Sequence, residues 1–403
     1  MALRFFLVFL LSIGFHWSLA QQEAPVSPKE KDLIDVAEKL LGKPILKRDT
    51  AKKEAGKIYF SGSPSIGYSL SSGWAGLVVA NGAFYTGVDK AAKLSNVYVD
   101  ALYTQQKQTV VHLQSNIWTK GNRFNIVNDW RYYDYPQKTY GLGGNTNLNN
   151  YANQAFKYLR LYQTVLKSIR PNLYAGFGYA LDYHWKITGT SLDAPDGDVG
   201  VITNINAYGI SDKSTSSGVL ANLLFDNRLN SINPSGGSYA NIVYRANVTG
   251  LGSDNNWQSL LIDLRHYIPF PRHSENILAF WSYNWLTLGG NPPYLDLPST
   301  GWDTYGNTGE GYIQGRFRDK NMLFLEAEYR FKISPNGLFG GVVFVSGQSF
   351  SNWPSNTYQT VAPAAGFGLR TKFNKYSRTN IAIDYGFGQN GSQGIFVNLG
   401  EVF

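Results

Sequence analysis

The chain has 403 residues, of which 15% are aromatic, with 42 glycines, no cysteine and a formal net charge of +8. The absence of cysteine excludes disulfide bonds, thiol catalysis and an acylated N-terminal cysteine. Lysine and arginine are spread along the chain in no run longer than a pair, so the positive charge does not predict nucleic-acid binding. Contacts with lipid phosphates or ion pairs inside the protein explain the charge more simply.

The first twenty residues are predicted to be a secretory signal peptide. Arg4 is the only charged residue of this segment, residues 5–14 form an apolar core, and Ser18-Leu19-Ala20 offers small residues before Gln21. The apolar stretch is too short for a membrane-spanning helix. We therefore expect export from the cytoplasm, with cleavage before Gln21.

Residues 21–55 are polar and contain the only good helical pattern of the mature chain. Ser27-Pro28-Lys29-Glu30 predicts an N-cap, a proline at the first helical position and a capping-box glutamate. The apolar residues that share one face of this helix, over about 28–41, are Leu33, Val36, Ala37, Leu40 and Leu41. The segment is either an ordinary surface helix or a periplasmic plug or docking helix beside the domain that follows.

From residue 57 onward, short alternating segments separated by Gly, Asn, Ser and Pro give sixteen candidate strands. They span about 57–69, 74–87, 95–106, 108–119, 122–134, 155–169, 172–187, 216–226, 237–248, 257–269, 274–287, 320–332, 337–347, 363–373, 378–388 and 394–403. Several of them are long enough for a tilted strand to cross the hydrocarbon of a bilayer.

Alternation is clearest in the strand predicted over 320–332. Leu323 and Leu325 fall on one face of this strand, whereas Glu326 and Glu328 fall on the other. Such a pattern also suits a soluble antiparallel sheet with one wet face. The last strand of the chain distinguishes a membrane barrel from such a soluble sheet.

The last predicted strand closes on the final residue of the chain. A terminal aromatic residue on an alternating strand is typical of outer-membrane barrels, whose assembly machinery reads that strand. Phe396, Leu399 and Phe403 are therefore the candidate assembly signal. Because lipid tolerates no unpaired backbone group, the sheet must close on itself. The sequence predicts an all-β fold, a sixteen-stranded antiparallel transmembrane β-barrel of the cell outer membrane, with a short N-terminal periplasmic helix.

The motifs that carry chemistry in other proteins are weak or absent. Asp193, Asp196 and Asp198 approach the spacing of a calcium loop but lack its twelfth-position glutamate, so a solvated turn is the preferred interpretation. Asp182 and His184 share a strand face, as in an outer-membrane protease or acyl hydrolase, but no G-x-S-x-G motif accompanies them. The protein is predicted not to be an enzyme and to need no cofactor or metal.

The last third of the chain carries the most specific pattern. The run GYIQGRFRDKN at 311–321 leads directly into the strand that ends Glu328-Tyr329-Arg330-Phe331, and AGFGLR follows at 365–370. These segments resemble the bacterial surface antigen barrel of the BamA/TamA outer-membrane assembly superfamily, most closely its short members without POTRA domains. The resemblance covers about residues 56–403. It implies a long loop at about 288–319 that folds into the lumen.

The resemblance also implies a network between this loop and the lumen wall. In the family the loop has an Arg-Gly-aromatic tip, and its arginine pairs with an aspartate on the following strand pair. Here the tip reads Glu310-Gly311-Tyr312, and Ser346 stands where the family often has the aspartate. Arg316 or Arg318 is then expected to supply the guanidinium and to pair with the carboxylates of the next strand. The expected network comprises Glu310, Gly311, Tyr312, Arg316, Phe317, Arg318, Asp319, Glu326, Glu328 and Ser346.

By this resemblance, the protein assists insertion, assembly or translocation of outer-membrane proteins by opening the seam between its first and last strands. A passive pore or structural barrel without insertase activity is the alternative, and an outer-membrane enzyme is a third hypothesis. The expected partners are outer-membrane lipids, the outer-membrane assembly machinery, and client proteins or accessory subunits. Nucleic acid is not expected as a partner.

Overall fold

The computed structural model describes residues 29–43, 56–87 and 92–403. The predicted signal peptide and much of the segment up to residue 55 lie outside these residues. Two α-helices occur in the described part of the chain, α2 (Leu33–Leu41) and α3 (Val199–Tyr208). Neither of these helices is long and apolar enough to span a membrane.

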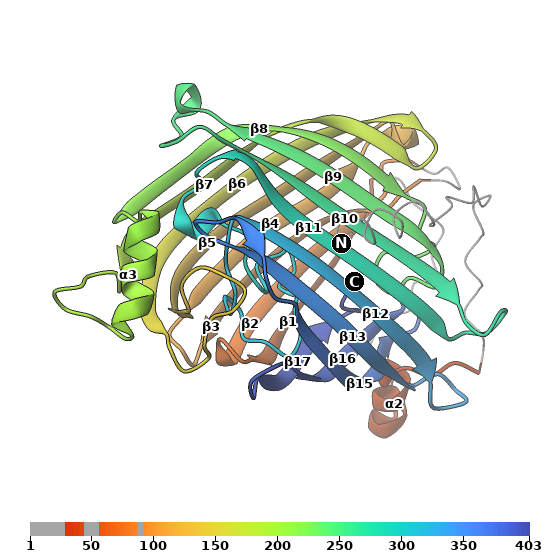
Figure 1. Cartoon of the computed structure of the whole chain (residues 1–403). Helices are drawn as coiled ribbons and strands as arrows, with labels where there is room; N and C mark the ends of the chain where they lie inside the picture. Colours follow the sequence, from red (N-terminus) through yellow and green to blue (C-terminus); the bar gives the residue numbers. More distant parts are fainter. Residues whose placement is uncertain (1–28, 44–55, 88–91) are drawn as a thin grey trace.

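Sixteen strands form one antiparallel meander that is wound into a barrel (Figure 1). They are β1 (Ile58–Ser69), β2 (Gly73–Phe84), β3 (Ser95–Thr104), β4 (Thr109–Trp118), β5 (Phe124–Thr139), β6 (Ala152–Arg170), β7 (Leu173–Thr188), β8 (Lys213–Asp226), β9 (Gly237–Asn247), β10 (Trp257–Pro269), β11 (Ile277–Gly290), β12 (Asn321–Lys332), β13 (Phe339–Asn352), β15 (Ala362–Asn374), β16 (Thr379–Phe387) and β17 (Gln393–Leu399). The two-residue β14 (Thr357–Tyr358) only extends the hairpin that follows β13. The predicted fold class and strand number are confirmed.

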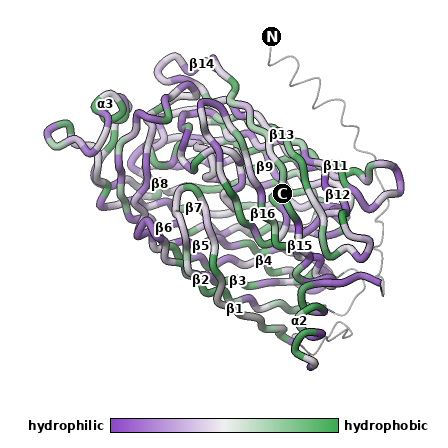
Figure 2. The backbone as a smooth tube through the Cα atoms, turned by 90° about the horizontal axis from the view of Figure 1, so that it is seen from below, coloured by the Kyte–Doolittle hydropathy of each residue, from purple (hydrophilic) through white to green (hydrophobic). Residues whose placement is uncertain are grey.

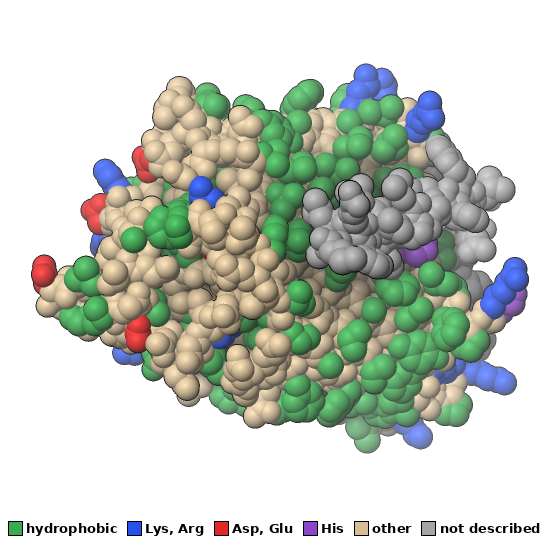
Figure 3. Space-filling view, in the orientation of Figure 1, with side chains coloured by type: hydrophobic (Ala, Val, Ile, Leu, Met, Phe, Trp, Pro, Cys, Tyr) green, Lys and Arg blue, Asp and Glu red, His purple; other side chains and the backbone are tan. Residues whose placement is uncertain are grey.

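The faces of the strands follow the predicted alternation. On β12, Glu326 and Glu328 are buried inside the barrel, whereas Leu325 is exposed on its outer wall. On β15, Arg370 is buried, whereas Phe367 is exposed. Hydrophobic and hydrophilic residues alternate along the strands in Figure 2, and hydrophobic side chains cover much of the outer wall in Figure 3. An apolar exterior around a polar interior is the pattern of a barrel that crosses a membrane.

Helix α2 begins later than predicted. Its N-cap is Asp32, whose side chain accepts a hydrogen bond from the Asp35 backbone N–H at 2.8 Å, while Asp35 caps Asp32 in return. Glu30, the expected capping-box residue, instead binds Lys372 on β15. Ser27 and Pro28 lie outside the described residues. The helix starts at Leu33, because Asp32 and Asp35 form a capping box at this point of the chain.

Helix α3 was not predicted, because its segment was interpreted as a loop. It lies in the connection between β7 and β8, at the end of the barrel opposite α2 (Figure 1). The carboxylate of Asp198 caps it by accepting a hydrogen bond from the Val201 backbone N–H at 2.9 Å. Ile202 and Ile205 are fully buried in a cluster with aromatic residues of the lumen. Packing of this short apolar stretch against the barrel, rather than helical propensity, favours the helix.

The barrel has a seam between its first and last strands. β1 pairs with β2 along all twelve of its residues, whereas β17 has seven residues and pairs with β16. In the described part of the chain no ladder joins β17 to β1, although Cα atoms of the two strands come within 8 Å. A Cβ built on Gly394 of β17 would lie 2.4 Å from the side chain of Leu70, which directly follows β1. Side-chain packing therefore closes the barrel where hydrogen bonding does not.

The last four residues leave the barrel wall, contrary to the predicted strand over 394–403. β17 ends at Leu399, and Gly400 has a φ of 108°, a conformation that glycine adopts readily. The chain then turns into the lumen, where Phe403 is only 4% exposed. Phe403 consequently does not lie on the lipid-facing row, because the lumen offers aromatic partners for its ring.

Candidate functional site in the lumen

The connection between β11 and β12, residues 291–320, is packed inside the barrel (Figure 1). Tyr294, Leu297 and Phe317 from this loop are buried among aromatic and aliphatic side chains of the lumen. The Gly143 backbone N–H donates to the Arg318 carbonyl at 2.8 Å, which ties the loop to the connection between β5 and β6. We refer to residues 291–320 as the lumenal loop.

The end of the lumenal loop is tied to a second wall of the barrel. The Asp319 carboxylate accepts hydrogen bonds from the Ser351 hydroxyl at 2.7 Å and from the Trp353 backbone N–H at 3.0 Å. Ser351 lies on β13, whereas Gly143 lies in the β5–β6 connection. The end of the loop is therefore held at Arg318 and Asp319, where the β5–β6 connection meets the end of β13.

The tip of the lumenal loop lies on β16 and the turn that follows it, where two glycines make room for it. A Cβ on Gly386 would lie 2.6 Å from the Gly311 backbone nitrogen, and a Cβ on Gly388 would lie 2.6 Å from the Tyr312 ring. Gly311 itself has a φ of 100°, which strongly favours glycine at this position. Backbone approach of this kind needs glycine on both sides of the contact.

Tyr312 fixes the tip in place. Its hydroxyl donates to the Pro363 carbonyl on β15 at 2.7 Å and accepts a hydrogen bond from the Gln389 backbone N–H at 2.9 Å. The ring packs edge-on against Phe317 with centroids 5.4 Å apart. The tip is thus docked on the two strands that precede β17.

Glu310 projects from this tip into a buried cluster of carboxylates and arginines. Its members come from the loop, from β12, β15 and β16, and from the residues after β17. They are Glu310, Glu326, Glu328, Arg330, Arg370, Asp384 and Glu401. We refer to these residues as the carboxylate cluster.

The arginines of the carboxylate cluster bind three of its five acidic groups. Arg330 lies 2.6 Å from Glu328, and Arg370 lies 2.6 Å from Asp384 and 2.7 Å from Glu401. The carboxylates thus outnumber the guanidinium groups, and some of them have no cation of their own. Like charges in such a site cannot all ionise without cost.

Glu310 and Glu326 are the acidic groups without a partner. Glu310 is 1% exposed, and neither of its carboxylate oxygens has a hydrogen-bond partner among the described residues, nor do those of Glu326. Burial, together with the nearby Asp384 and Glu328 carboxylates, raises the pKa of Glu310 well above its usual range. The docked tip therefore favours the neutral form of this side chain.

The two arginines of the lumenal loop do not pair with Glu326 or Glu328, so that prediction is wrong. The Arg316 guanidinium donates to the hydroxyl and the carbonyl of Thr146 and lies over the Phe317 ring. Arg318 donates to the carbonyls of Tyr294 and Leu295, each at 3.1 Å. The loop returns toward the β5–β6 connection after its tip, so that Glu310, rather than either arginine, faces β12.

Ser346 lies where the sequence placed it, on β13 opposite Glu326 in the β12–β13 ladder. It is half-buried and neighbours the carboxylate cluster through its pairing with Glu326.

The C-terminal residues join the same site, which sequence reasoning missed. The Phe403 ring stacks on Trp281 with centroids 5.1 Å apart, and Arg330 donates to the Phe403 carbonyl at 2.9 Å. Asn307 of the lumenal loop donates to the Val402 carbonyl at 2.6 Å. Gly400 and Glu401 are the sequence signals for this turn, because Glu401 would put a charge on the exposed row of Ile395, Val397 and Leu399 if the strand continued.

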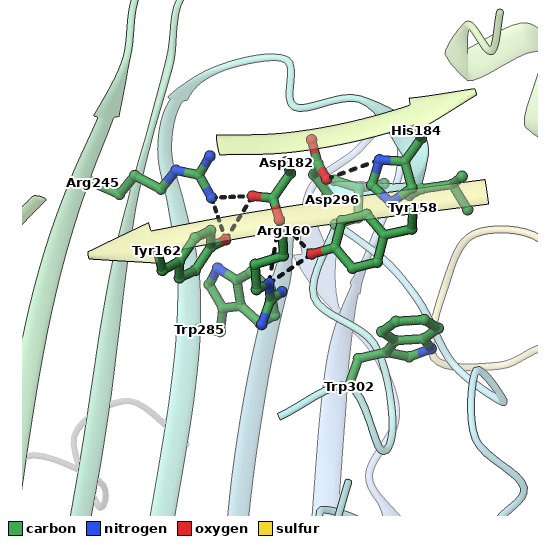
Figure 4. A pocket seen from close by; sticks show the side chains of 11 residues that line it. Tyr158, Arg160, Tyr162, Asp182, His184, Arg245, Trp285, Asp296 and Trp302 are labelled. Carbon is green, nitrogen blue, oxygen red and sulfur yellow. Dashed lines mark hydrogen bonds and ion pairs between the residues drawn. The ribbon is translucent and has the colours of Figure 1, made fainter. Parts of the chain in front are cut away.

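A second polar network lies between β6, β7, β9 and the lumenal loop (Figure 4). The Asp182 carboxylate binds Arg245 and accepts a hydrogen bond from the Tyr162 hydroxyl at 2.6 Å. The His184 ring stacks on Tyr158 at 4.3 Å, and its Nδ1 lies 3.6 Å from Asp296 of the loop. Figure 4 shows these side chains turned toward one another across a small space.

The second network has no room for a substrate. Its cavity has a volume of about 20 Å³, which suits a single water molecule. Burial, with the neighbouring Asp182 carboxylate, raises the pKa of Asp296 to about 7. Asp182 of the candidate pair thus binds side chains of the wall, and the lumenal loop is held through Asp296, which accepts a hydrogen bond from the Ser216 hydroxyl at 2.5 Å. The residues around Asp196 and Asp198 form no group that could hold a metal within the described ranges.

These features define a class, a sixteen-stranded barrel with an apolar exterior, a loop packed into its lumen, and a seam without backbone pairing. Solved structures with this fold include BamA from Haemophilus ducreyi lacking POTRA domains 1–3, with a TM-score of 0.53 and 16% identity over 85% of this chain and 68% of that one. CdiB from Escherichia coli has a TM-score of 0.55 and 11% identity over 87% of this chain and 63% of that one. CdiB from Acinetobacter baumannii has a TM-score of 0.53 and 11% identity over 85% of this chain and 60% of that one.

The comparisons by sequence found no matching family model and no matching curated protein. At identities of 11–16% the structural likeness concerns the fold. The chain spans less than two thirds of the two CdiB chains. The resemblance noted in the sequence is confirmed at the level of the barrel.

Proposed function

We propose that the protein is an integral outer-membrane barrel that assists insertion, assembly or translocation of outer-membrane proteins at the seam between β1 and β17. The observation that carries this proposal is the absence of a ladder between these strands in the described part of the chain. Unpaired backbone groups in hydrocarbon cost several kcal/mol each. Such edges can therefore pair with a strand of another protein, which would satisfy them.

The diverted C-terminal residues support this role. Because Gly400 turns the chain into the lumen, β17 offers seven residues to the twelve of β1. β17 is therefore too short to form a complete ladder along β1. The side-chain contact between Leu70 and Gly394 can open without breaking backbone hydrogen bonds.

The packed lumen disfavours the alternative of a passive open pore. The lumenal loop, the C-terminal residues and the second polar network fill the interior. A structural barrel without insertase activity remains the other outcome of the test below. The lipids of the outer membrane are the proposed partners of the apolar wall, and its clients are proposed to be unfolded barrel proteins.

We propose, in addition, that the last strand acts as an assembly signal. Leu399 is 70% exposed on the outer wall, whereas Phe396 lies on the opposite face of β17 and Phe403 lies in the lumen. Leu399 is therefore the member of this group that lipid or assembly machinery can reach in the folded barrel.

A disulfide bond across the seam, which can be formed and then reduced, tests the function. The chain contains no cysteine, so Leu70→Cys with Gly394→Cys introduces a single possible disulfide where the Leu70 side chain contacts Gly394. In vesicles, the reduced double variant is expected to accelerate folding of a small urea-denatured outer-membrane barrel, and the oxidised variant is expected to lose this acceleration. Leu70→Cys alone is the matched control, because a side chain on Gly394 would clash with Leu70 in the other single variant.

Equal acceleration by the oxidised and reduced double variant would contradict a role of the seam. No acceleration by the wild-type protein would favour the structural barrel. A steady conductance of the wild-type protein in planar bilayers would favour the passive pore instead.

A further inference from the structure

Helix α2 is attached to the barrel by its polar side. The Asp35 carboxylate binds the Lys375 ammonium group at 2.8 Å, and the Asp32 carboxylate accepts a hydrogen bond from the Lys375 backbone N–H at 3.0 Å. The Lys31 backbone N–H donates to the Asn336 carbonyl at 3.0 Å. Lys375 lies in the turn between β15 and β16, and Asn336 lies in the turn between β12 and β13. Two hairpin turns thus hold the acidic side of the helix.

The apolar side of α2 faces away from these contacts. Asp35 lies on nearly the opposite side of the helix from Leu40 and Leu41. Leu40 is 81% exposed, Leu41 and Val36 are also exposed, and no residue of α2 is buried. An amphipathic helix on a protein surface usually packs its apolar side against the protein. On α2 the polar side contacts the protein instead, which leaves the apolar side exposed.

The rim to which α2 is attached continues the lipid-facing wall of the barrel. Ile333 and Tyr376 are exposed on the same two hairpins that hold the helix. Phe339 and Phe373 are exposed at the adjoining ends of β13 and β15, strands that also expose Val343, Val345, Phe367 and Leu369 on their outer rows. Aromatic residues at the end of such a row mark the level of the lipid headgroups. Figure 2 shows α2 beside the strand ends at this rim.

Positive charge lies close to the apolar side. Lys39 and Lys43 are exposed at the C-terminal end of α2. A short helix with exposed leucines on one side and lysines beside them is suited to the surface of a bilayer that contains anionic lipid.

We propose that α2 is an interfacial anchor, whose apolar side lies in the phospholipid leaflet at the periplasmic rim of the barrel. Leu40, Leu41 and Val36 then lie among the acyl chains, while Asp35 holds the turn between β15 and β16. This turn leads into the hairpin that ends in β17, so the anchor ties the neighbourhood of the seam to the membrane surface. The inference rests on the barrel lying in a bilayer, not on its activity toward clients.

Single-cysteine labelling of the full-length protein tests the anchor, because the native chain has no cysteine. Leu40→Cys and Lys39→Cys carry the same environment-sensitive fluorophore on different sides of one helix. Val343→Cys on the exposed outer row of β13 marks lipid, and Asp193→Cys in the exposed β7–β8 connection marks water. The proteins are reconstituted in vesicles of phosphatidylethanolamine and phosphatidylglycerol.

The two quenchers are brominated acyl chains and aqueous acrylamide. We expect brominated lipid to quench the label on Leu40→Cys as strongly as that on Val343→Cys, and more strongly than that on Lys39→Cys. Acrylamide should quench Leu40→Cys much less than Asp193→Cys. Equal quenching of Leu40→Cys and Lys39→Cys, or acrylamide quenching as at Asp193→Cys, would overturn the proposal. Protection of Leu40→Cys from both quenchers would overturn it too, in favour of a covering protein segment.

Discussion

Replacing Glu310 with glutamine is expected to stabilise the protein increasingly as the pH rises. The carboxyl group is buried without a hydrogen-bond partner and lies near Asp384 and Glu328. Burial and these like charges raise its folded-state pKa above its ordinary value of 4.5. The neutral acid therefore favours the docked tip, and an ionised carboxylate opposes it.

The sign and size of the effect follow from proton linkage. A carboxyl group with a raised folded-state pKa stabilises the fold fully below its unfolded-state pKa, and this contribution is lost as the pH rises through the folded-state pKa. One proton gives a slope of at most about 1.4 kcal/mol per pH unit. Glutamine has no proton to lose, so Glu310→Gln should remove this part of the slope.

The assay is the free energy of unfolding of the detergent-solubilised barrel, between about pH 5 and pH 9, a range that begins above the ordinary pKa of a glutamate. The wild-type protein should lose stability relative to Glu310→Gln as the pH rises. Glu275→Gln, at an exposed ion pair with Lys332, is the control and should follow the wild type. Parallel curves for the wild type and Glu310→Gln would refute the reasoning.

Three further substitutions probe the other contacts of the lumen. Phe403→Ala should lower the free energy of unfolding by about 3–5 kcal/mol, because the ring is buried, and an unchanged value in urea titrations would place the ring outside the lumen. Arg316→Ala should cost about 1–3 kcal/mol, since it leaves the partly buried contact with Thr146 unmade, and a neutral effect on thermal melting would argue against that contact. Gly388→Val should release the loop tip and raise its cleavage by protease. Gly289→Ala, where an added Cβ would meet no other atom within 4 Å, should leave cleavage unchanged.

The barrel wall could be predicted from the sequence because its signal is local and repeated. Each strand alternates between lipid and lumen, so a few residues such as Leu325 and Glu326 define the two faces. The same logic gave the number of strands and their approximate ends. The last strand, however, was predicted to reach residue 403 because Phe403 falls on the same row as Leu399. The structure ends this strand at Leu399, because Gly400 turns the backbone.

The contacts of the lumenal loop could not be predicted in this way. The loop has no periodicity, so nothing in the sequence tells which wall Arg316 or Glu310 will face. Its path is decided by partners far away in the chain, such as Gly388 beneath the tip and Thr146 beside the guanidinium. The resemblance implied an inward loop but not the contacts of Arg316 and Arg318, which lie with Thr146 and Tyr294.

The start of α2 depended on contacts of the same kind. Ser27 and Asp32 each precede a residue that can complete a capping box, and local sequence does not rank the two. Lys375 favours the second one, because it binds both Asp32 and Asp35.

The most direct test of the central claim is to find which strand a client protein meets in the membrane. A photoreactive phenylalanine analogue replaces Ile66 on β1, which is 77% exposed, or Val219 on β8, which is 50% exposed on a distant part of the wall. A small urea-denatured outer-membrane barrel is then added to vesicles that contain either variant, and the sample is irradiated. We predict a covalent adduct with the client at Ile66 and little or none at Val219. Equal adducts at both positions, or an adduct at Val219 alone, would contradict a role of the β1–β17 seam.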